Sequence, residues 1–168
     1  MINDRILILD KENIRQKIKR IAYEIFESNF QENALIIAGI VGQGYELARQ
    51  IMIDLNGISD ISTQLVEVAI DKAAPHYDEI SLDIETEKLK GINVILVDDV
   101  LNTGRTMAYS LRPFLEIEIN KIEIAVLVDR GHSRFPVKAN FTGLELSTTL
   151  NDHIEVVLKS DEFAVYLN

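Results

Sequence analysis

Apolar residues along the chain are arranged in two alternating patterns. Short unbroken runs at Ala34 to Val41, Val94 to Val97 and Ile122 to Val128 are typical of strands buried on both faces. Between them, apolar residues recur every three or four positions, which predicts amphipathic helices over about Lys11 to Ser28 and Tyr45 to Leu55. The alternation favours an α/β fold with a mostly parallel central sheet flanked by helices, and such sheets bind ligands at the carboxyl ends of their strands.

Further segments complete the predicted elements. Ile6 to Leu9 is a short apolar run, and Asp10 is placed to cap the helix that follows it. Residues 63–70 and 79–85 predict the two strands of a hairpin. A helix interrupted near Pro113 is predicted from its apolar face, which comprises Ala108, Leu111, Phe114 and Leu115.

The composition places these elements in a single domain, residues 1–168. A length of 168 residues matches one domain, and no Pro/Gly-rich linker divides the chain. There is no cysteine, which excludes disulfides and thiolate metal sites. The first four residues do not begin a basic and apolar leader, and no stretch approaches about 18 uncharged apolar residues. We therefore expect neither a signal peptide nor a membrane span. We expect the protein to be cytoplasmic.

Candidate chemistry is concentrated where the central apolar run ends. Asp98 and Asp99 place two carboxylates side by side, which suits a pair of sugar hydroxyls or a Mg²⁺ ion bound mostly through water. The next helix opens with free backbone N–H groups, two hydroxyls and a guanidinium, which form a cradle for a phosphate at Thr103, Gly104, Arg105 and Thr106. A diol site beside a phosphate cradle fits a ribose 5-phosphate.

The same residues allow two other interpretations. An acidic pair followed by threonines can form only a loop and a helix cap, without any ligand. An aspartyl-phosphate site needs a second Asp two residues after the nucleophile, where this chain has Val100 and Leu101. The whole run after a buried strand therefore favours the ribose 5-phosphate.

A second turn, rich in glycine, follows the run at Ala34 to Val41. Its glycines, Gly39, Gly42 and Gly44, are not spaced as in a dinucleotide-binding fingerprint or a P-loop. On their own they indicate only that the backbone approaches something closely.

The hydrophobic run followed by D-D-V-L-x-T-G-R-T resembles the phosphoribosyl-diphosphate-binding motif of the type I phosphoribosyltransferases. The resemblance implies the fold of that family, with a small C-terminal hood of about residues 129–168. It implies that Asp98 and Asp99 are catalytic residues that hold the ribose hydroxyls and Mg²⁺, while residues 103–106 hold the 5-phosphate of phosphoribosyl diphosphate.

Two more segments acquire roles from the resemblance. It identifies the turn after the second predicted strand as the pyrophosphate loop, which consists of Val41, Gly42, Gln43 and Gly44. It identifies residues 71–78 as a flexible lid that closes over the substrate, with Lys72 and His76 as the candidates for contacts. An ordinary hairpin is the alternative for the lid segment.

Over nearly the whole chain the likeness is to the family of bifunctional pyrimidine-operon attenuation regulators and uracil phosphoribosyltransferases. Residues 129–143 closely resemble the D-R-G-H-x-x-x-P-[IV]-x-A-[DN]-[FY]-x-G segment of that family. The family carries a Lys and an Arg in the pyrophosphate loop, where this chain has Val41 and Gln43. One preorganised charge-stabilising donor is worth about 10²–10³ in rate, so we expect reduced turnover.

The base pocket is expected under residues 129–151. Asp129 and Arg130 are candidates for base or metal contacts, with a structural ion pair as the alternative. Asn102 stands where the purine enzymes of the superfamily place an acidic residue, and an amide is not a base at neutral pH, so a pyrimidine is favoured over hypoxanthine or guanine. The leading hypothesis is an enzyme that joins uracil to phosphoribosyl diphosphate, with Mg²⁺, and releases UMP and pyrophosphate.

Two alternatives to that hypothesis remain open: a purine phosphoribosyltransferase, and a catalytically weak regulator of pyrimidine genes that senses nucleotides and binds RNA. The net charge of −10 opposes RNA binding. A local basic patch remains conceivable from Lys19, Arg20, Arg134 and Lys138. We expect a homodimer or a larger homo-oligomer.

Overall fold

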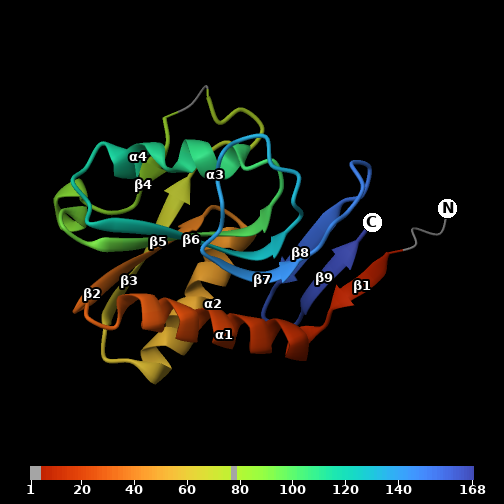
Figure 1. Cartoon of the computed structure of the whole chain (residues 1–168), viewed down its shortest axis with the longest axis horizontal. Helices are drawn as coiled ribbons and strands as arrows, with labels where there is room; N and C mark the ends of the chain where they lie inside the picture. The colour runs from red at the N-terminus through yellow and green to blue at the C-terminus, as the bar shows by residue number, and fades with distance from the viewer. Residues whose placement is uncertain (1–4, 77–78) are drawn as a thin grey trace.

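The computed structural model describes residues 5–76 and 79–168. The predicted absence of a leader at residues 1–4 and two positions of the predicted lid, Tyr77 and Asp78, lie outside the described residues. The described chain forms a six-stranded central sheet and a separate three-stranded sheet, with helices on both faces of the central sheet (Figure 1). No helix within these residues is both long and apolar enough to cross a membrane.

The central sheet is mostly parallel, as the alternating pattern predicts. Its strand order is β4-β3-β2-β5-β6-β7, and only the edge pair β3 and β4 is antiparallel. The six strands are β2 (Ala34–Ile40), β3 (Ser62–Ala69), β4 (Ser81–Leu82), β5 (Asn93–Leu101), β6 (Lys121–Asp129) and β7 (Phe141–Glu145). The helices are α1 (Lys11–Asn29), α2 (Gln43–Ile58), the 3-10 helix η1 (Thr86–Leu89), α3 (Arg105–Ser110) and α4 (Arg112–Leu115).

Two hydrophobic cores fill the two faces of this sheet, because successive side chains of a strand point to opposite sides. In β5, Ile95 and Val97 join the core beneath α1 and α2, whereas Val94 and Leu96 join the core beneath α3 and α4. Figure 1 shows α1 and α2 on one side of the sheet and α3 and α4 on the other. The prediction of strands buried on both faces is confirmed.

The start of α1 follows its sequence signal. Asp10 is the N-cap residue, and its Oδ1 accepts a hydrogen bond from the Asn13 amide at 2.8 Å. The Asn13 side chain in turn accepts from the Asp10 amide at 3.4 Å. This reciprocal pair fixes the first turn, after which Ile14 and Ile18 bury the predicted face.

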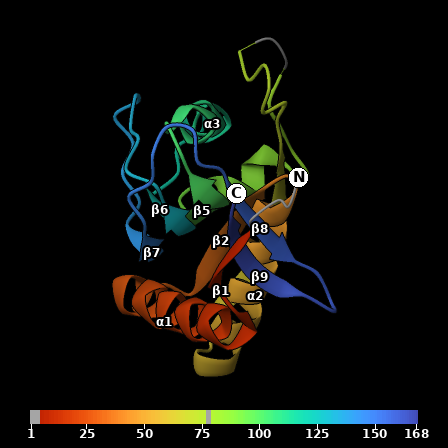
Figure 2. The same cartoon turned by 90° about the vertical axis from the view of Figure 1, so that its right-hand side faces the viewer.

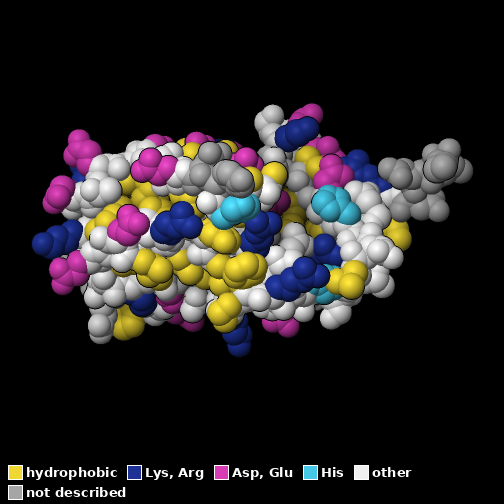
Figure 3. Space-filling view, turned by 90° about the horizontal axis from the view of Figure 1, so that it is seen from above, with side chains coloured by type: hydrophobic (Ala, Val, Ile, Leu, Met, Phe, Trp, Pro, Cys, Tyr) yellow, Lys and Arg dark blue, Asp and Glu magenta, His cyan; other side chains and the backbone are white. Residues whose placement is uncertain are grey.

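Two predicted elements differ in the structure. The second hairpin strand, expected over residues 79–85, is reduced to Ser81–Leu82. The Asp83 carboxylate accepts a hydrogen bond from the Glu67 amide at 2.7 Å, and the backbone pairing of β3 with β4 ends at this point. The prediction that Leu115 lies on the buried face of the helix is wrong, because this residue is 70% exposed. The segment breaks into two short helices, α3 and α4, with Pro113 in the first turn of α4. Figure 3 shows hydrophobic side chains at the surface over these two helices.

The separate sheet joins the two ends of the chain. Its order is β1-β9-β8, built from Ile6–Leu9, Phe163–Leu167 and Ile154–Leu158. Ile6 lies opposite Leu167 in the register, and Figure 2 shows the three strands together beside the central sheet. Within the segment expected to form the hood, β7 belongs to the central sheet, and β1 contributes a strand from the other end of the chain.

Candidate active site

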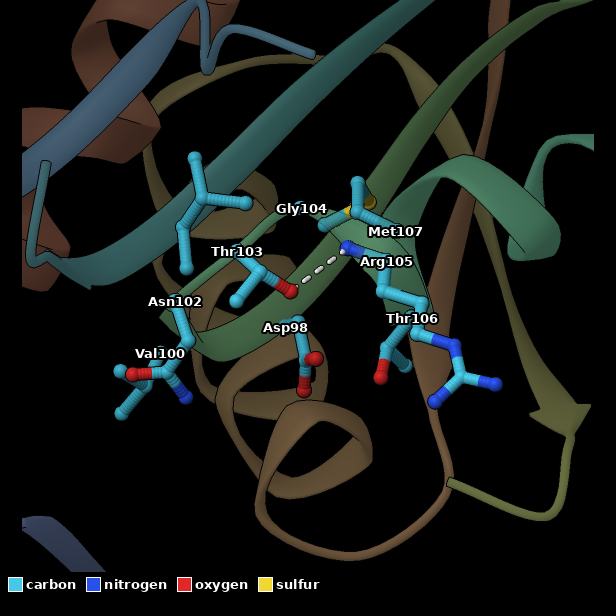
Figure 4. Close-up of a pocket in the computed structure, with 9 residues that line it drawn as sticks. Asp98, Val100, Asn102, Thr103, Gly104, Arg105, Thr106 and Met107 are labelled. Carbon is cyan, nitrogen blue, oxygen red and sulfur yellow. Dashed lines mark hydrogen bonds between the residues drawn. The ribbon is translucent and has the colours of Figure 1, made fainter. Parts of the chain in front are cut away.

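The two carboxylates lie on the last part of β5 rather than beyond its end. Asp98 is buried at 4% exposure, and the Asp99 side chain is half-buried. Asp98 Oδ1 accepts a hydrogen bond from the Asp99 amide at 2.9 Å. Figure 4 places the Asp98 carboxylate at the centre of the pocket formed by the strand end and the turn into α3.

Burial dominates the electrostatics of this pair. Burial and the neighbouring Asp99 charge both raise the pKa of Asp98 and the Lys72 ammonium lowers it, and together they bring it to about 8. A group that donates hydrogen bonds to Asp98, or a cation placed beside it, therefore favours the ionised form. The pair is poised to gain such a partner.

The predicted lid already supplies one. Lys72 Nζ lies 3.1 Å from Asp98 Oδ1 and 3.9 Å from Asp99 Oδ1. In the same segment, the His76 Nδ1 lies 3.1 Å from Nη2 of Arg105. The lid therefore contacts both halves of the candidate site, the carboxylate pair and the guanidinium of the phosphate cradle. The sequence predicted the segment but not these contacts.

The phosphate cradle forms a tight turn into α3. Gly104 has φ +82°, a left-handed conformation that favours glycine, and the helix that it opens has no side-chain cap on this residue. The Thr103 hydroxyl accepts from the Arg105 amide at 3.3 Å, and the Thr103 carbonyl accepts from the Phe135 amide at 3.1 Å. These bonds hold the turn open toward the pocket, which Thr106 also lines.

The glycine-containing turn after β2 lies against the same site. Gly42 has φ +94° and is the N-cap of α2, again without a side-chain cap. A Cβ on Gly44 would lie 2.7 Å from Asp98 Oδ1 and 3.1 Å from its Cα, so only glycine allows the start of α2 to lie this close to β5. The Gln43 side chain points elsewhere, because its Oε1 accepts from the Leu158 amide of β8 at 2.7 Å. Val41 supplies no polar group.

A hollow of about 290 Å³ connects β5 to the separate sheet, a size close to the lower end of the range for small-molecule sites. Lys72 and Thr106 lie along one side together with the carboxylates and Asn102, and the first residues of β8 form the other side. The sequence analysis missed this second wall, which comprises His153, Ile154, Glu155 and Val156. No local pattern marks them, since they reach the site only through the fold-back of β8.

The residues expected under the hood have mainly structural contacts. Arg130 is buried and donates to the Asn102 Oδ1 at 2.8 Å, to the Thr148 hydroxyl at 2.9 Å, and to the backbone carbonyls of Thr149 and Asp152. Asp129 accepts from the Gly131 amide at 2.9 Å. Among the described residues no carboxylate lies within ion-pair distance of Arg130, so the alternative of a structural ion pair is not formed. Hydrogen bonds of Arg130 instead tie loop 148–152 to Asn102, just after β5.

The carboxylate pair suits a magnesium ion only in part. Within residues 5–76 and 79–168, no cluster of three or more His, Cys, Asp or Glu side chains is suited to enclose a metal. Mg²⁺ is commonly bound by one or two carboxylates, water and substrate phosphates. Asp98 and Asp99 fit that donor set, with the remaining ligands coming from substrate and water.

The fold and the site together define a class of protein. A mostly parallel α/β sheet carries an acidic pair and a turn with free backbone N–H groups at the end of one strand, an arrangement suited to a sugar phosphate. The family model described as the phosphoribosyl transferase domain matches residues 7–162, and the chain belongs to this family.

Individual relatives agree with this assignment. The "Bifunctional protein PyrR" of Fusobacterium nucleatum is 35% identical over 160 residues, which are 91% of this chain and 90% of the relative. The protein of the same name from Leuconostoc citreum is 34% identical, in a match that covers 90% of this chain and 90% of the relative. These matches confirm the resemblance to a type I phosphoribosyltransferase close to the pyrimidine regulator family.

Solved structures support the fold. The hypoxanthine phosphoribosyltransferase of Trypanosoma cruzi superposes with a TM-score of 0.79 at 16% identity, covering 96% of this chain and 94% of the other. A hypoxanthine-guanine phosphoribosyltransferase of Bacillus anthracis gives 0.73 at 14% identity, covering 84% and 82%. The mostly parallel phosphoribosyltransferase fold predicted from the sequence is thereby confirmed.

Proposed function

We propose that the protein is an enzyme that transfers ribose 5-phosphate from phosphoribosyl diphosphate to uracil, forming UMP and pyrophosphate in pyrimidine salvage. One observation carries the proposal: the acidic pair of β5 and the phosphate-binding turn at Thr103 to Thr106 line one pocket. A ribose 5-phosphate presents hydroxyls and a terminal phosphate, and these two features need acceptors and donors respectively.

Each side chain has a defined task in this proposal. Asp98 and Asp99 accept hydrogen bonds from the ribose hydroxyls, which replace the Lys72 ammonium that lies 3.1 Å from Asp98. Arg105 and the backbone N–H groups of the turn hold the 5-phosphate. The Gly42 to Gly44 backbone, at the start of α2, receives the pyrophosphate.

The reaction is a displacement at C1 of the ribose. The bond from C1 to pyrophosphate breaks, its electron pair leaves with pyrophosphate, the bond from N1 of uracil to C1 forms, and the N1 proton is released to water. Mg²⁺, which the carboxylates fit as water-mediated partners, neutralises charge on pyrophosphate when bound. The protein contributes orientation and exclusion of water, the latter through the lid around Lys72.

The choice of a pyrimidine rests on Asn102. This neutral amide lines the hollow next to the carboxylate pair. A purine phosphoribosyltransferase stays as an alternative, and the hypoxanthine enzymes that share the fold do not favour it, since likeness at 14–16% identity concerns the fold alone.

A second candidate function is a nucleotide-sensing regulator. It is favoured by the pyrophosphate loop, where Val41 is apolar and the Gln43 side chain is bonded to Leu158. RNA is the partner that the family resemblance suggests. Arg20 is a weak candidate for RNA contact, because its guanidinium is bound to Glu24 and to the carbonyls of Thr142 and Gly143.

The test measures UMP formation from uracil and phosphoribosyl diphosphate with Mg²⁺, beside hypoxanthine and guanine as competing bases. Asp98→Asn/Asp99→Asn is expected to remove activity by about 10²-fold or more, since two charge-assisted hydrogen-bond sites are lost. Asp60→Asn/Asp161→Asn, two exposed positions, removes the same charge elsewhere and serves as the control. Robust activity in the first double variant would remove the assigned role.

Binding measurements separate the second candidate. Tight binding of UMP by calorimetry without any turnover supports the sensor, and binding of a pyrimidine-leader RNA that weakens steeply with salt supports the attenuator. Sedimentation of the same samples tests the expected homo-oligomer.

A further inference from the structure

Asn102 follows β5 directly and borders both parts of the site. Its side chain lines the small pocket at the phosphate-binding turn and also the larger hollow that reaches β8. It is exposed, so a ligand in either space can contact it. What such a ligand meets depends on which end of the amide faces it, the carbonyl oxygen or the NH₂ group.

The neighbouring Arg130 settles that orientation. A guanidinium has five N–H donors and no acceptor, so only the oxygen of an amide can face it. Arg130 Nη1 donates to Asn102 Oδ1 at 2.8 Å. Arg130 is itself 8% exposed, and its Nε and Nη2 are bonded to Thr148 and to two loop carbonyls. A side chain held at so many points cannot follow Asn102 if the amide turns.

The consequence is a fixed donor in the site. With Oδ1 on Arg130, the Asn102 NH₂ group is directed away from that contact, and Figure 4 shows the nitrogen on the Asp98 side of the side chain. This NH₂ group can therefore donate a hydrogen bond only to an acceptor atom of the ligand.

The identity of that atom follows from the proposed function, on which this inference rests. With the ribose on Asp98 and Asp99 and its phosphate on the turn, the base extends from C1 into the hollow that Asn102 borders. The edge nearest the sugar carries the atoms on either side of the glycosidic nitrogen. In uracil linked through N1 these are the O2 carbonyl and C6–H, and in a purine linked through N9 they are the N3 acceptor and C8–H.

We propose that Asn102 recognises the base by donating a hydrogen bond to the O2 carbonyl of a pyrimidine, and that Arg130 is the positioning residue that fixes the amide for it. This contact requires an acceptor beside the glycosidic nitrogen and is indifferent to position 4. It does not separate uracil from cytosine, which also carries O2, or from a purine, whose N3 is an acceptor at the corresponding position.

The test compares nucleotides that differ by one atom. Calorimetry measures the binding of UMP, 2-thio-UMP, 4-thio-UMP and ribose 5-phosphate, since sulfur is a weak acceptor. In the wild type, 2-thio-UMP is expected to bind roughly 5- to 10-fold more weakly than UMP, the effect of one hydrogen bond, and 4-thio-UMP equally well. In Asn102→Ala the preference for UMP over 2-thio-UMP disappears, while ribose 5-phosphate binds unchanged. Asn56→Ala, on an exposed part of α2, is the control and keeps the preference.

The role of Arg130 has its own pair of variants. Arg130→Met frees the Asn102 amide to rotate, and the discrimination against 2-thio-UMP is expected to fall toward that of Asn102→Ala. Thr148→Val removes another hydrogen bond of Arg130, the one to Nε, and leaves the Asn102 contact in place. It is expected to keep the discrimination even where it lowers stability. Equal discrimination in both variants would overturn the positioning role.

The outcomes separate this inference from the proposed function. If ribose 5-phosphate and UMP bind but 2-thio-UMP binds as tightly as UMP, the contact of Asn102 is wrong and the site assignment stands. If neither ribose 5-phosphate nor UMP binds, both fall. If UMP binds with the expected discrimination but no UMP is formed, the enzyme proposal fails and the contact holds for a nucleotide sensor.

Discussion

Two turns of the molecule share one backbone design and differ in their side chains. After β2 and after β5, which are neighbouring parallel strands, a glycine with positive φ opens a helix that has no side-chain cap on that residue. The turn after β5 adds the Asp98 carboxylate, threonine hydroxyls and the Arg105 guanidinium to the pocket. The turn after β2 adds no charge, because Val41 is apolar and Gln43 is bonded to β8.

Under the proposed function, binding the sugar and stabilising the leaving group are separate tasks of the two turns. Backbone N–H groups at a helix start attract an anion. Charged side chains then decide how far that attraction grows as the leaving group gains negative charge. On this proposal the chain has charged side chains for the first task at β5 and only the backbone for the second at β2.

The largest effect is expected at the point where the start of α2, just after the first turn, touches β5. In Gly44→Ala the new Cβ lies 2.7 Å from Asp98 Oδ1 and 3.1 Å from the Asp98 backbone, so the start of α2 or β5 must move. A displacement of this kind is expected to weaken ribose 5-phosphate binding by about 10²-fold. Gly57→Ala, in the same helix with no atom near its Cβ, is the control. Wild-type affinity in Gly44→Ala, measured by calorimetry, would mean that the turns are independent.

Adding a charged side chain to the turn after β2 is expected to give the next largest effect. Val41→Lys places an ammonium at the pyrophosphate loop, and turnover of uracil to UMP is expected to rise about 10- to 10²-fold, since a preorganised cation stabilises the leaving group. Val41→Met, which has similar length but no charge, should leave the rate near that of the wild type. Inhibition by pyrophosphate gives a second measurement. Unchanged inhibition in Val41→Lys would show that this loop does not face pyrophosphate.

The same comparison explains what the sequence could predict. The carboxylate pair and the turn at residues 103–106 lie within nine consecutive positions, so their pattern alone predicted a site at the end of β5. The buried strands were equally local, because runs such as Ile122 to Val128 carry their own signal. The start of α1 was likewise predicted from Asp10, its N-cap residue.

Contacts between distant segments left no such pattern. Lys72 meets Asp98 from 26 residues away, and Gln43 meets Leu158 from 115 residues away. Each depends on the course of a loop or on the pairing of β1 with β9 and β8, which is a property of the whole chain. The family resemblance indicated that a cation is missing at Gln43, but only the fold shows that the Gln43 side chain binds the Leu158 amide of the separate sheet.

A smaller effect concerns the buried charge that only the β5 turn carries. The pKa of Asp98 is raised to about 8 by burial, so the native state holds its proton over a range in which the unfolded chain, with an ordinary carboxyl, has lost it. The stability from this group is present below about pH 4 and is lost as the pH rises toward about 8. In Asp98→Asn the free energy of unfolding does not fall with pH for this reason, because the amide does not titrate.

Urea denaturation of both proteins from pH 4 to pH 9 measures the effect. The free energy of unfolding of Asp98→Asn relative to wild type is expected to rise across this range. Asp60→Asn, at an exposed site, is the control and should give a constant difference. A constant difference for Asp98→Asn as well would place the charge of Asp98 in a solvated environment.

The smallest effect tests whether the two turns are equal at the level of the backbone. Gly42→Ala and Gly104→Ala each put a side chain at positive φ, and neither Cβ has an atom closer than 3.5 Å, so only conformational strain opposes the change. Each is expected to lower the free energy of unfolding by about 1 kcal/mol. Gly91→Ala, at φ +72° and away from the site, calibrates that strain. A cost at Gly42 well above those at Gly91 and Gly104, in urea denaturation without ligand, would show that the turn after β2 is held in a tighter conformation than the turn after β5, and the two would no longer share one backbone design.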